Sequence, residues 1–538
     1  MNRTLATQAI SRQLNMGTVE AQKIIEGHPY FISILTAITF YLIVDALSLA
    51  FKSTKKQYPL IGKASKHFLF RKTRQTLEWL WDGPKLIHDS YVKYPDTIYQ
   101  LPNQDRTTIV LPPRYLKEIK ELPHDVANNS QSTSDFFVGK WTTLDMDMFS
   151  HANIDAIKTQ YIAKIGQQMG PAYNEAIYGF NKHFTSYQDW TPIVAQPRIL
   201  QIVAQMVART VVGPEICRNP EWVQSVTQYA QNVFQLATYL KLVPAVLRPL
   251  VVAFTPYRYR IHRCRRTIRR IITPTLNHLL AWRREQPESW AMRLKSEERL
   301  STVDWLVATS PEAESQPWLI AHRLTGVSFG ASHTTSNHVG NCILELAADF
   351  DRWAPPLREE IEAILGRNPT TVTNADLSKM WKLDSFMKEC QRFHPPSKLS
   401  VNRTLLKPYT LSSGQTLPKG AHICFAGVPM SMSEEYFENA EKFDGFRFER
   451  MRRDPETEHF SGLQFTSSYA GSLHFGHGKQ MCPGRFMGSL ISKLFVIEIL
   501  QRYDLKLLDG EKRPSNIMLM DMDMPDPKYQ ILMRDRRL

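Results

Sequence analysis

The chain has 538 residues, a formal net charge of +14 and six cysteines that lie far apart without a CxxC pair. The cysteine spacing argues against a disulfide scaffold and favours reduced thiols in a cytosolic setting. The charge excess indicates an acidic partner or an anionic surface, and it does not by itself imply nucleic acid. Length alone would allow several domains, but no linker, repeat or low-complexity block divides the chain. We therefore expect one large domain.

An apolar run at residues 30–51 is about long enough to cross a bilayer as a helix. It is too long for a signal peptide and lacks a small-residue cleavage site, whereas a buried core helix stays open as an alternative. Residues 52–74 hold eight Lys/Arg and no acid, which places the bulk of the chain in the cytosol. We expect a short lumenal N-terminus (1–29), a transmembrane anchor (30–51), a basic, proline-containing hinge (52–74) and the main domain (75–538).

Most of the main domain is typical of helices, with short strands and turns predicted at residues 97–110 and 410–425. Residues 240–256 are apolar but contain three prolines, so this run either lies at a membrane interface or packs in the core. Residues 257–270 hold seven arginines. Such a run is usually a solvated helix face, and contact with phosphate or anionic lipid is the sharper alternative.

Two more helices are predicted further along the chain. Residues 317–350 form a long helix with small and polar residues at its centre. Residues 382–393 form a shorter helix with apolar residues at i, i+3, i+4 and i+7, and Pro395 and Pro396 stop it.

The most informative stretch of the chain is the loop from Phe475 to Arg485, in which glycines frame the lone Cys482. An apolar, helix-like run follows at residues 486–500. A thiolate at a helix N-terminus is stabilised by backbone N–H groups and the helix dipole. The glycines let the backbone pass close to a large flat group, against which Phe475 can pack. The loop is thus suited to presenting one sulfur to a metal, and a buried structural cysteine is the alternative.

The spacing Phe475-x-x-Gly478-x-x-x-Cys482-x-Gly484 resembles the haem-ligand loop of cytochromes P450. The resemblance implies heme b as cofactor, with the Cys482 thiolate as the axial iron ligand. It also implies the cytochrome P450 fold, which is mainly α with a small β region, behind the N-terminal transmembrane helix. Residues 75–538 would then be the P450 catalytic domain.

A second resemblance to the family is Glu389-x-x-Arg392, which matches its K-helix motif. Residues three apart on a helix can pair, although such pairs are also common on surfaces. In the family an arginine or histidine from a later loop joins the pair, and Arg447 takes that place here. Gly445 stands where the family more often has proline. The resemblance implies a structural triad that holds the proximal side together and does no chemistry.

The centre of the long helix, Gly330 to Thr335, resembles the oxygen-binding part of the P450 I-helix. Thr334 takes the place of the threonine beside bound dioxygen, where its hydroxyl can take part in a proton path. His333 stands where the family often has an acid, and it either relays protons or shapes the pocket. The presence of this threonine argues against a haem isomerase.

The haem propionates need partners that the resemblance indicates less directly. Gln480 occupies a position where the family often has histidine or arginine, and it can donate a hydrogen bond but no charge. By family position, Arg403 is our first choice for the charge, with His151 and Lys158 second. Each of these residues could equally be an ordinary surface residue.

The family implies a monooxygenase that depends on O2. No dinucleotide fingerprint occurs in a strand–turn–helix context, so the electrons must come from a partner protein. The family implies that this partner is NADPH–cytochrome P450 reductase. It places the catalytic domain on the cytosolic side of the endoplasmic reticulum membrane. Segments 136–151, 330–335 and 396–401 are expected to line a pocket for a bulky hydrophobic substrate.

Residues 212–219 and the His-Thr-Thr form of the long helix look like fungal P450s near the ent-kaurene oxidase group. This similarity implies a terpenoid, indole diterpene or meroterpenoid in secondary metabolism. Two alternatives stay open: a haem-thiolate isomerase or dehydratase that needs no reductase and, more remotely, a non-catalytic membrane protein with a structural Cys482.

Overall fold

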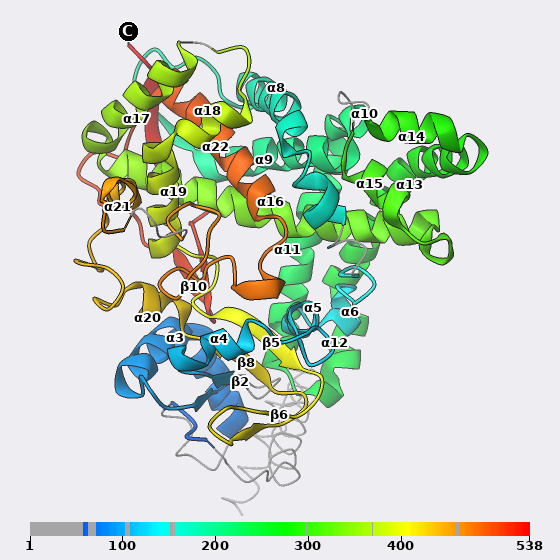
Figure 1. Ribbon diagram of the computed structural model, residues 1–538, viewed down its shortest axis with the longest axis vertical. Coiled ribbons are helices and arrows are strands. Elements are labelled where there is room, and N and C mark those ends of the chain that lie inside the picture. Colours follow the sequence, from blue (N-terminus) through cyan, green and yellow to red (C-terminus); the bar gives the residue numbers. More distant parts are fainter. Residues whose placement is uncertain are drawn as a thin grey trace, which may run out of the picture.

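The computed structural model describes residues 58–62, 71–102, 108–150, 154, 156–295, 300–367, 369–457 and 462–537. This part of the chain is mainly helical, with four small sheets (Figure 1). Within it, no helix combines the length and the apolar character that crossing a bilayer requires. The predicted anchor at residues 30–51 lies outside the described residues.

The helices that carry α labels are α3 (Arg71–Lys93), α4 (Leu116–Ile119), α5 (Asn129–Phe136), α6 (Gly139–Thr142), α8 (Ile165–His183), α9 (Ala195–Val212), α10 (Pro214–Cys217), α11 (Pro220–Leu242), α12 (Arg248–Phe254), α13 (Pro256–Glu285), α14 (Pro287–Lys295), α15 (Thr302–Thr309), α16 (Pro317–Ala348), α17 (Phe350–Leu365), α18 (Asn374–Lys379), α19 (Trp381–Phe393), α20 (Gly427–Ser431), α21 (Arg447–Arg453) and α22 (Arg485–Arg502). The strands are β1 (Tyr99–Leu101), β2 (Thr108–Val110), β3 (Ala127–Asn128), β4 (Thr191–Val194), β5 (Ser400–Leu405), β6 (Tyr409–Thr410), β7 (Thr416–Leu417), β8 (His422–Phe425), β9 (Tyr503–Lys506), β10 (Ile517–Leu519), β11 (Met522–Met524) and β12 (Gln530–Asp535).

Helix α16 runs through the middle of the helical part and packs against α9, α13 and α22 (Figure 1). It begins at Pro317, whose missing N–H costs nothing in the first turn. Buried residues occur on all its faces, which is typical of a helix in a large core. The prediction of one long helix is confirmed, and it ends at Ala348.

Two shorter helices predicted from the sequence are also confirmed. The helix predicted at residues 382–393 is α19, and its apolar stripe, which includes Phe386 and Met387, is fully buried. The apolar run after the loop is α22, which begins at Arg485 and buries most of its residues against α8, α16 and α17. Helix α22 therefore holds the C-terminal side of the cysteine loop, which it follows directly.

The largest sheet has the strand order β1-β2-β8-β5-β3 and lies at the lower end of the molecule in Figure 1. The strands predicted at residues 97–110 and 410–425 are confirmed as β1, β2 and β6 to β8. The pairing of β5 with β8 shifts register between Ser400 and Arg403, where Val401 has φ +55°. A β-branched residue rarely adopts this left-handed conformation, and such irregularities re-aim the side chains that follow.

The proline-interrupted run at residues 240–256 is divided among three elements. Helix α11 ends at Leu242, a short 3-10 turn covers Ala245–Leu247, and α12 follows as Arg248–Phe254. The arginine-rich stretch after it forms the first half of α13. In Figure 1, α12 lies at the same end of the molecule as α3 and the large sheet.

Candidate haem site

The loop that carries Cys482 leads directly into α22, as the sequence predicted. The Cys482 backbone N–H donates to the Phe475 carbonyl over 2.8 Å and closes the loop. The backbone N–H groups of Gly484 and Arg485 hydrogen-bond to the Cys482 sulfur. Burial raises the pKa of this thiol, and these N–H groups and the Arg485 charge oppose that rise. The donors thus favour the thiolate, which is the form that ligates a metal.

Position 478 requires a glycine, because of both its backbone conformation and the atoms packed against it. Its φ is +73°, a region in which side chains are rarely found. A Cβ at this position would lie 2.4 Å from the Lys120 carbonyl oxygen, at the end of α4. The glycine therefore lets the cysteine loop pack directly on the backbone of a segment more than 300 residues earlier.

The three residues of the expected triad are buried and in direct contact. Arg392 donates to both carboxylate oxygens of Glu389 over 2.8 and 2.7 Å. Arg447 donates to Oε1 of the same carboxylate over 3.2 Å. The Asp444 N–H also donates to Oε1 over 3.0 Å, which is the fourth hydrogen bond that the Glu389 carboxylate accepts. One carboxylate therefore holds two guanidinium groups from α19 and α21.

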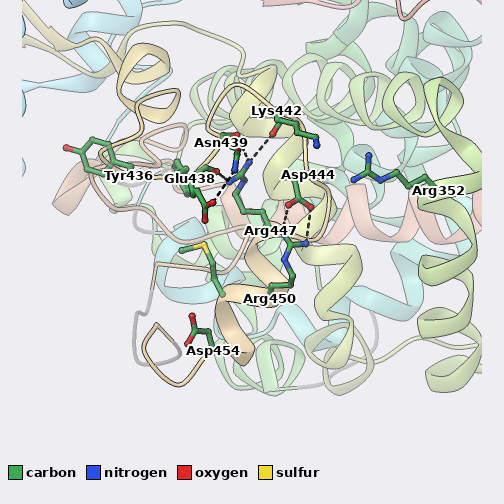
Figure 2. Close-up of a pocket in the computed structure, with 11 residues that line it drawn as sticks. Arg352, Tyr436, Glu438, Asn439, Lys442, Asp444, Arg447, Arg450 and Asp454 are labelled. Carbon is green, nitrogen blue, oxygen red and sulfur yellow. Dashed lines mark hydrogen bonds and ion pairs between the residues drawn. The ribbon is translucent and has the colours of Figure 1, made fainter.

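The guanidinium groups also tie down the chain between α20 and α21. Figure 2 shows Arg447 donating to the carbonyls of Glu438, Asn439 and Lys442, and Arg450 paired with Asp444. These residues line a cavity of about 570 Å³ on the outer side of the triad. No residue of the cysteine loop or of α16 lines this cavity, so it is separate from the candidate haem site.

Gly445 replaces the proline of the family for a steric reason. A Cβ at Gly445 would lie 2.7 Å from the Phe386 ring and 3.1 Å from the Trp353 ring. These rings belong to an aromatic cluster formed by Trp353, Phe386, Phe443 and Phe446. Packing of aromatic rings against a bare backbone therefore holds the loop that supplies Arg447.

The centre of α16 borders open space, which we call the hollow. Gly330 and Thr334, one turn apart, are exposed although most of the helix is buried. A Cβ at Gly330 would meet no atom within 4 Å. The Thr334 hydroxyl donates to the Gly330 carbonyl over 2.6 Å, a bond that competes with the helical ladder. The neighbouring Thr335 is instead buried, 3.6 Å from the position of a Cβ on Gly488 of α22.

His333 lies beside this hollow as a neutral side chain. Burial lowers the pKa of its imidazole to about 4. Its Nε2 has no hydrogen-bond partner among the described residues. A histidine with this pKa carries no charge at neutral pH, so any proton transfer through it would involve the neutral ring.

Arg403 is a buried cation without a carboxylate partner in the described part of the chain. It is 1% exposed, and burial lowers the pKa of its guanidinium to about 10. Its Nη1 donates to the Asn402 carbonyl over 2.8 Å and its Nη2 to the His477 carbonyl over 3.4 Å, whereas Nε has no partner among the described residues. Leaving a buried charge unpaired costs several kcal/mol, on the order of the penalty for moving an ion out of water. The position therefore suits an anionic ligand.

The structure differs from the expectation for Gln480. Both N–H bonds of its amide are directed to backbone carbonyls, those of Ala127 over 2.7 Å and Leu122 over 3.3 Å. Its Oε1 accepts the Asn129 N–H over 2.9 Å. The two carbonyls occupy the donors that a propionate would need, so Gln480 fixes the loop to β3 and α5 instead.

The second-choice residues for the propionates lie elsewhere. The Lys158 ammonium donates to the Lys479 carbonyl over 3.0 Å on an exposed side of the loop. His151 lies outside the described residues. Arg403 is therefore the best placed of the three candidates for the charge.

Sequence reasoning did not identify Lys388, which is fully buried on α19. Its ammonium donates to the carbonyls of Gln464 and Ser467 over 2.9 and 3.1 Å. Ser468, next along the chain, donates to the Gly476 carbonyl over 2.6 Å. Lys388 thus holds the segment that supports the cysteine loop, and no local pattern distinguishes it from a surface lysine.

The comparisons with known proteins agree with this arrangement. Residues 168–533 match the family described as Cytochrome P450. Cytochrome P450 monooxygenase AN1598 of Emericella nidulans is 31% identical over 451 residues, 84% of this chain and 83% of the relative. Cytochrome P450 monooxygenase olcJ of Penicillium canescens is 29% identical over 508 residues, 93% and 92% of the two chains. The chain belongs to the cytochrome P450 family.

A solved structure supports the fold independently. The chain named retinoic acid bound cyanobacterial CYP120A1 superposes with a TM-score of 0.64 at 17% identity, over 86% of this chain and 96% of that one. The sequence identification as a fungal type of P450 is therefore confirmed, and so is the mainly α fold with its small β region. The protein is a P450 monooxygenase, and its cofactor is heme b, whose iron is ligated by a cysteine thiolate.

The residues present fit this cofactor. The buried guanidinium of Arg403, which has no carboxylate partner among the described residues, can bind a propionate. The loop from Phe475 to Gly484 presents the sulfur, and the hollow at Gly330 lies on α16. Phe475 reaches α16 through Phe465, because the ring of Phe465 lies 5.5 Å from Phe475 and stacks on His338 at 4.9 Å. Loop and central helix are thus held in one packed unit.

Proposed function

We propose that this monooxygenase oxidises a bulky hydrophobic substrate, a terpenoid, indole diterpene or meroterpenoid of fungal secondary metabolism, with Cys482 as the axial ligand. The observation that carries the proposal is the combination of a sulfur-presenting loop, a buried arginine without a carboxylate partner among the described residues, and the hollow at the centre of α16. The haem supplies oxygen activation when it is bound. The roles below belong to the residues of this chain.

The cysteine loop is proposed to hold the haem on the side of the sulfur, through Cys482, Phe475, Gly478 and Gly484. The N–H groups of Gly484 and Arg485 direct their partial positive charge at the sulfur and moderate its negative charge. Phe475 would pack against the haem when it is bound, and Gly478 lets the loop sit close to the end of α4. Glu389, Arg392 and Arg447 keep the supporting segment in place without contacting the cofactor.

Thr334, on α16, is proposed to take part in proton transfer. Its hydroxyl donates to the Gly330 carbonyl, so it can accept a hydrogen bond from a group in the hollow at the same time. His333 is proposed to shape the pocket as a neutral ring and to hold a proton on one ring nitrogen. Thr335 faces α22 and is excluded from this path.

The substrate pocket is proposed to include a cavity of about 210 Å³ that adjoins the sheet. Two segments expected from the sequence meet there: Phe136 and Phe137 come from one, and Pro396 and Leu399 from the other. Phe137 also packs edge-on against Phe329 of α16, at a ring distance of 5.3 Å. The lining combines apolar side chains, which suit a bulky apolar molecule, with polar ones, including His422 and Asp521, which can orient it.

NADPH–cytochrome P450 reductase is the proposed electron donor. Lys120, Lys158 and Lys479 gather on the outer side of the cysteine loop, and Glu121 is the acid that pairs with two of them. This leaves the surface over the thiolate loop basic. A basic face of this kind complements an acidic partner and steers its approach.

The protein is proposed to sit on the cytosolic side of the endoplasmic reticulum membrane, held by residues 30–51. Support comes from large apolar side chains exposed at one end of the described structure: Trp81 of α3 is 67% exposed, and Leu250 and Phe254 of α12 are 58% and 86% exposed. Figure 1 places α3 and α12 at the same end. Apolar surface of this kind marks a membrane or partner contact.

The test is turnover of a terpenoid panel by the full chain reconstituted with the reductase. We expect one panel member to gain one oxygen atom, with NADPH and O2 consumed in step with product. Turnover without consumption of NADPH or O2 would contradict the monooxygenase assignment. Oxidation confined to small polar compounds would contradict the substrate class.

A further inference from the structure

Helices α11 and α13 pack side by side and leave a groove of about 460 Å³ between their outer faces. On α11, the groove is lined by one outward stripe of neutral amides, Gln224, Gln228, Gln231 and Gln235, which are all exposed. Their spacing of three and four residues keeps them on one face of the helix. A solvated face usually mixes charges of both signs, and this stripe does not.

The α13 side of the groove carries positive charge. Arg260 and Arg263 line it and are exposed. At its far end, Arg270 pairs with Glu221 over 2.7 Å, the one carboxylate contact recorded for the seven arginines of this stretch among the described residues. The positive field is therefore poorly compensated. The pKa of His262 is lowered by burial and by the charges of Arg265, Arg258 and Arg266.

The groove begins where the exposed apolar tip formed by α12 ends. Phe254 is 86% exposed at the end of α12, and Tyr259 is 73% exposed on the first turn of α13. Tyr239 of α11 stacks on Tyr257 of α13 with ring centroids 5.4 Å apart. Along this helical hairpin the order is thus apolar, then aromatic, then basic and amide-bearing. The same order runs from acyl chains through the interface to headgroups in a bilayer.

We propose that the groove between α11 and α13 binds the headgroup of an anionic phospholipid while α12 lies at the acyl boundary. The proposal rests on the membrane association proposed above and adds a lipid class to it. The guanidiniums of Arg260 and Arg263 bind the phosphate, because their planar forks match its oxygens. The glutamine amides of α11 donate to, and accept from, the remaining polar groups of the headgroup.

The test places the full chain in nanodiscs that contain a trace of headgroup-photoactivatable phosphatidylserine or phosphatidylcholine. Crosslinked peptides are then mapped by mass spectrometry. We expect the serine lipid to label the groove-facing parts of α11 and α13 about fivefold more than the choline lipid. The Arg260→Gln/Arg263→Gln double variant should remove this preference. Arg266→Gln/Arg269→Gln is the matched control, since it removes two exposed arginines of the same helix that do not line the groove.

Equal labelling of the groove by both lipids would overturn the proposal, as would an equal loss of preference in the two double variants. If the groove variant fails to fold, the comparison of the two lipids on the wild-type chain still decides the question. Inorganic phosphate at matched ionic strength should not compete with labelling, and competition would indicate a free-phosphate site instead. Because turnover does not enter this measurement, its failure is distinguishable from failure of the proposed monooxygenase function.

Discussion

Glu389→Gln tests the triad most sharply, because it removes one charge and keeps the size of the side chain. Glu389 is fully buried and accepts four hydrogen bonds, two from Arg392, one from Arg447 and one from the Asp444 N–H. A glutamine would turn an amide donor toward one guanidinium. Both arginines would then remain buried without a compensating charge.

The expected cost follows from this burial. Removing one partner of a buried ion pair destabilises a protein by about 3–5 kcal/mol. Proteins are typically stable by about 5–15 kcal/mol, so the variant would lose roughly a fifth or more of a typical free energy of unfolding. We expect poor haem retention as well, because the triad holds the chain on the cysteine side of the fold.

Asp509→Asn is the matched control. Lys506 and Asp509 are three residues apart and 2.7 Å from each other, the same spacing and distance as the pair of Glu389 with Arg392. Their side chains are 36% and 81% exposed. An exposed pair contributes at most about 1 kcal/mol, so this variant should unfold close to the wild type.

The assay is urea unfolding of the haem-loaded protein, followed by the thiolate-haem absorbance and by far-UV circular dichroism. The midpoint of Glu389→Gln should fall well below that of Asp509→Asn. Coinciding midpoints for the two variants would refute the argument from burial. A lower midpoint for the exposed pair would refute it as well.

Three further outcomes are expected. Gly478→Ala should lower the fraction of protein with thiolate-ligated haem far more than Gly510→Ala. Both glycines have positive φ, but only Gly478 lies against the backbone of another segment. Equal fractions of thiolate-ligated haem in the two variants would contradict this. Thr334→Val should lower product formed per NADPH about 100-fold, whereas Thr335→Val should retain it, and a reversed order would exclude Thr334 from the proton path. Burial lowers the pKa of His333 from 6.5 to about 4. Between these two pH values the unfolded chain binds more protons than the folded one, so the free energy of unfolding falls as the pH drops through this range. His333→Gln should weaken that fall in urea midpoints, and an unchanged pH profile would show that His333 is not its source.

The sequence sufficed for features that short segments encode. The cysteine loop, the helix after it and the pair on α19 depend on spacings of a few residues, and the structure has them where they were predicted. Arg447 was predictable because its family position lies in a recognisable aromatic segment. Thr334 was assigned from its family position, and the structure adds that it is exposed to the hollow whereas the neighbouring Thr335 is buried beside α22.

The departures arose from contacts that are distant in sequence. The amide of Gln480 binds carbonyls of Leu122 and Ala127, more than 350 residues away, and no local pattern announces this. Arg403 gains its importance from the register shift after Ser400 and the left-handed Val401. Lys388 lies on a helix that is buried between earlier elements, α16 and α17, and later ones, α20 and α21. Such burial depends on the assembled fold and not on periodicity.

The central claim is that Cys482 is the thiolate ligand of a haem held by this fold. The reduced carbon monoxide difference spectrum of the full chain tests it most directly, with Cys482→Ala and the buried Cys424→Ala compared side by side. The account predicts the band of thiolate-ligated haem in the wild type and in Cys424→Ala, and its loss in Cys482→Ala. A thiolate band that persists without Cys482, or its absence from well-folded, haem-loaded wild-type protein, would contradict the account.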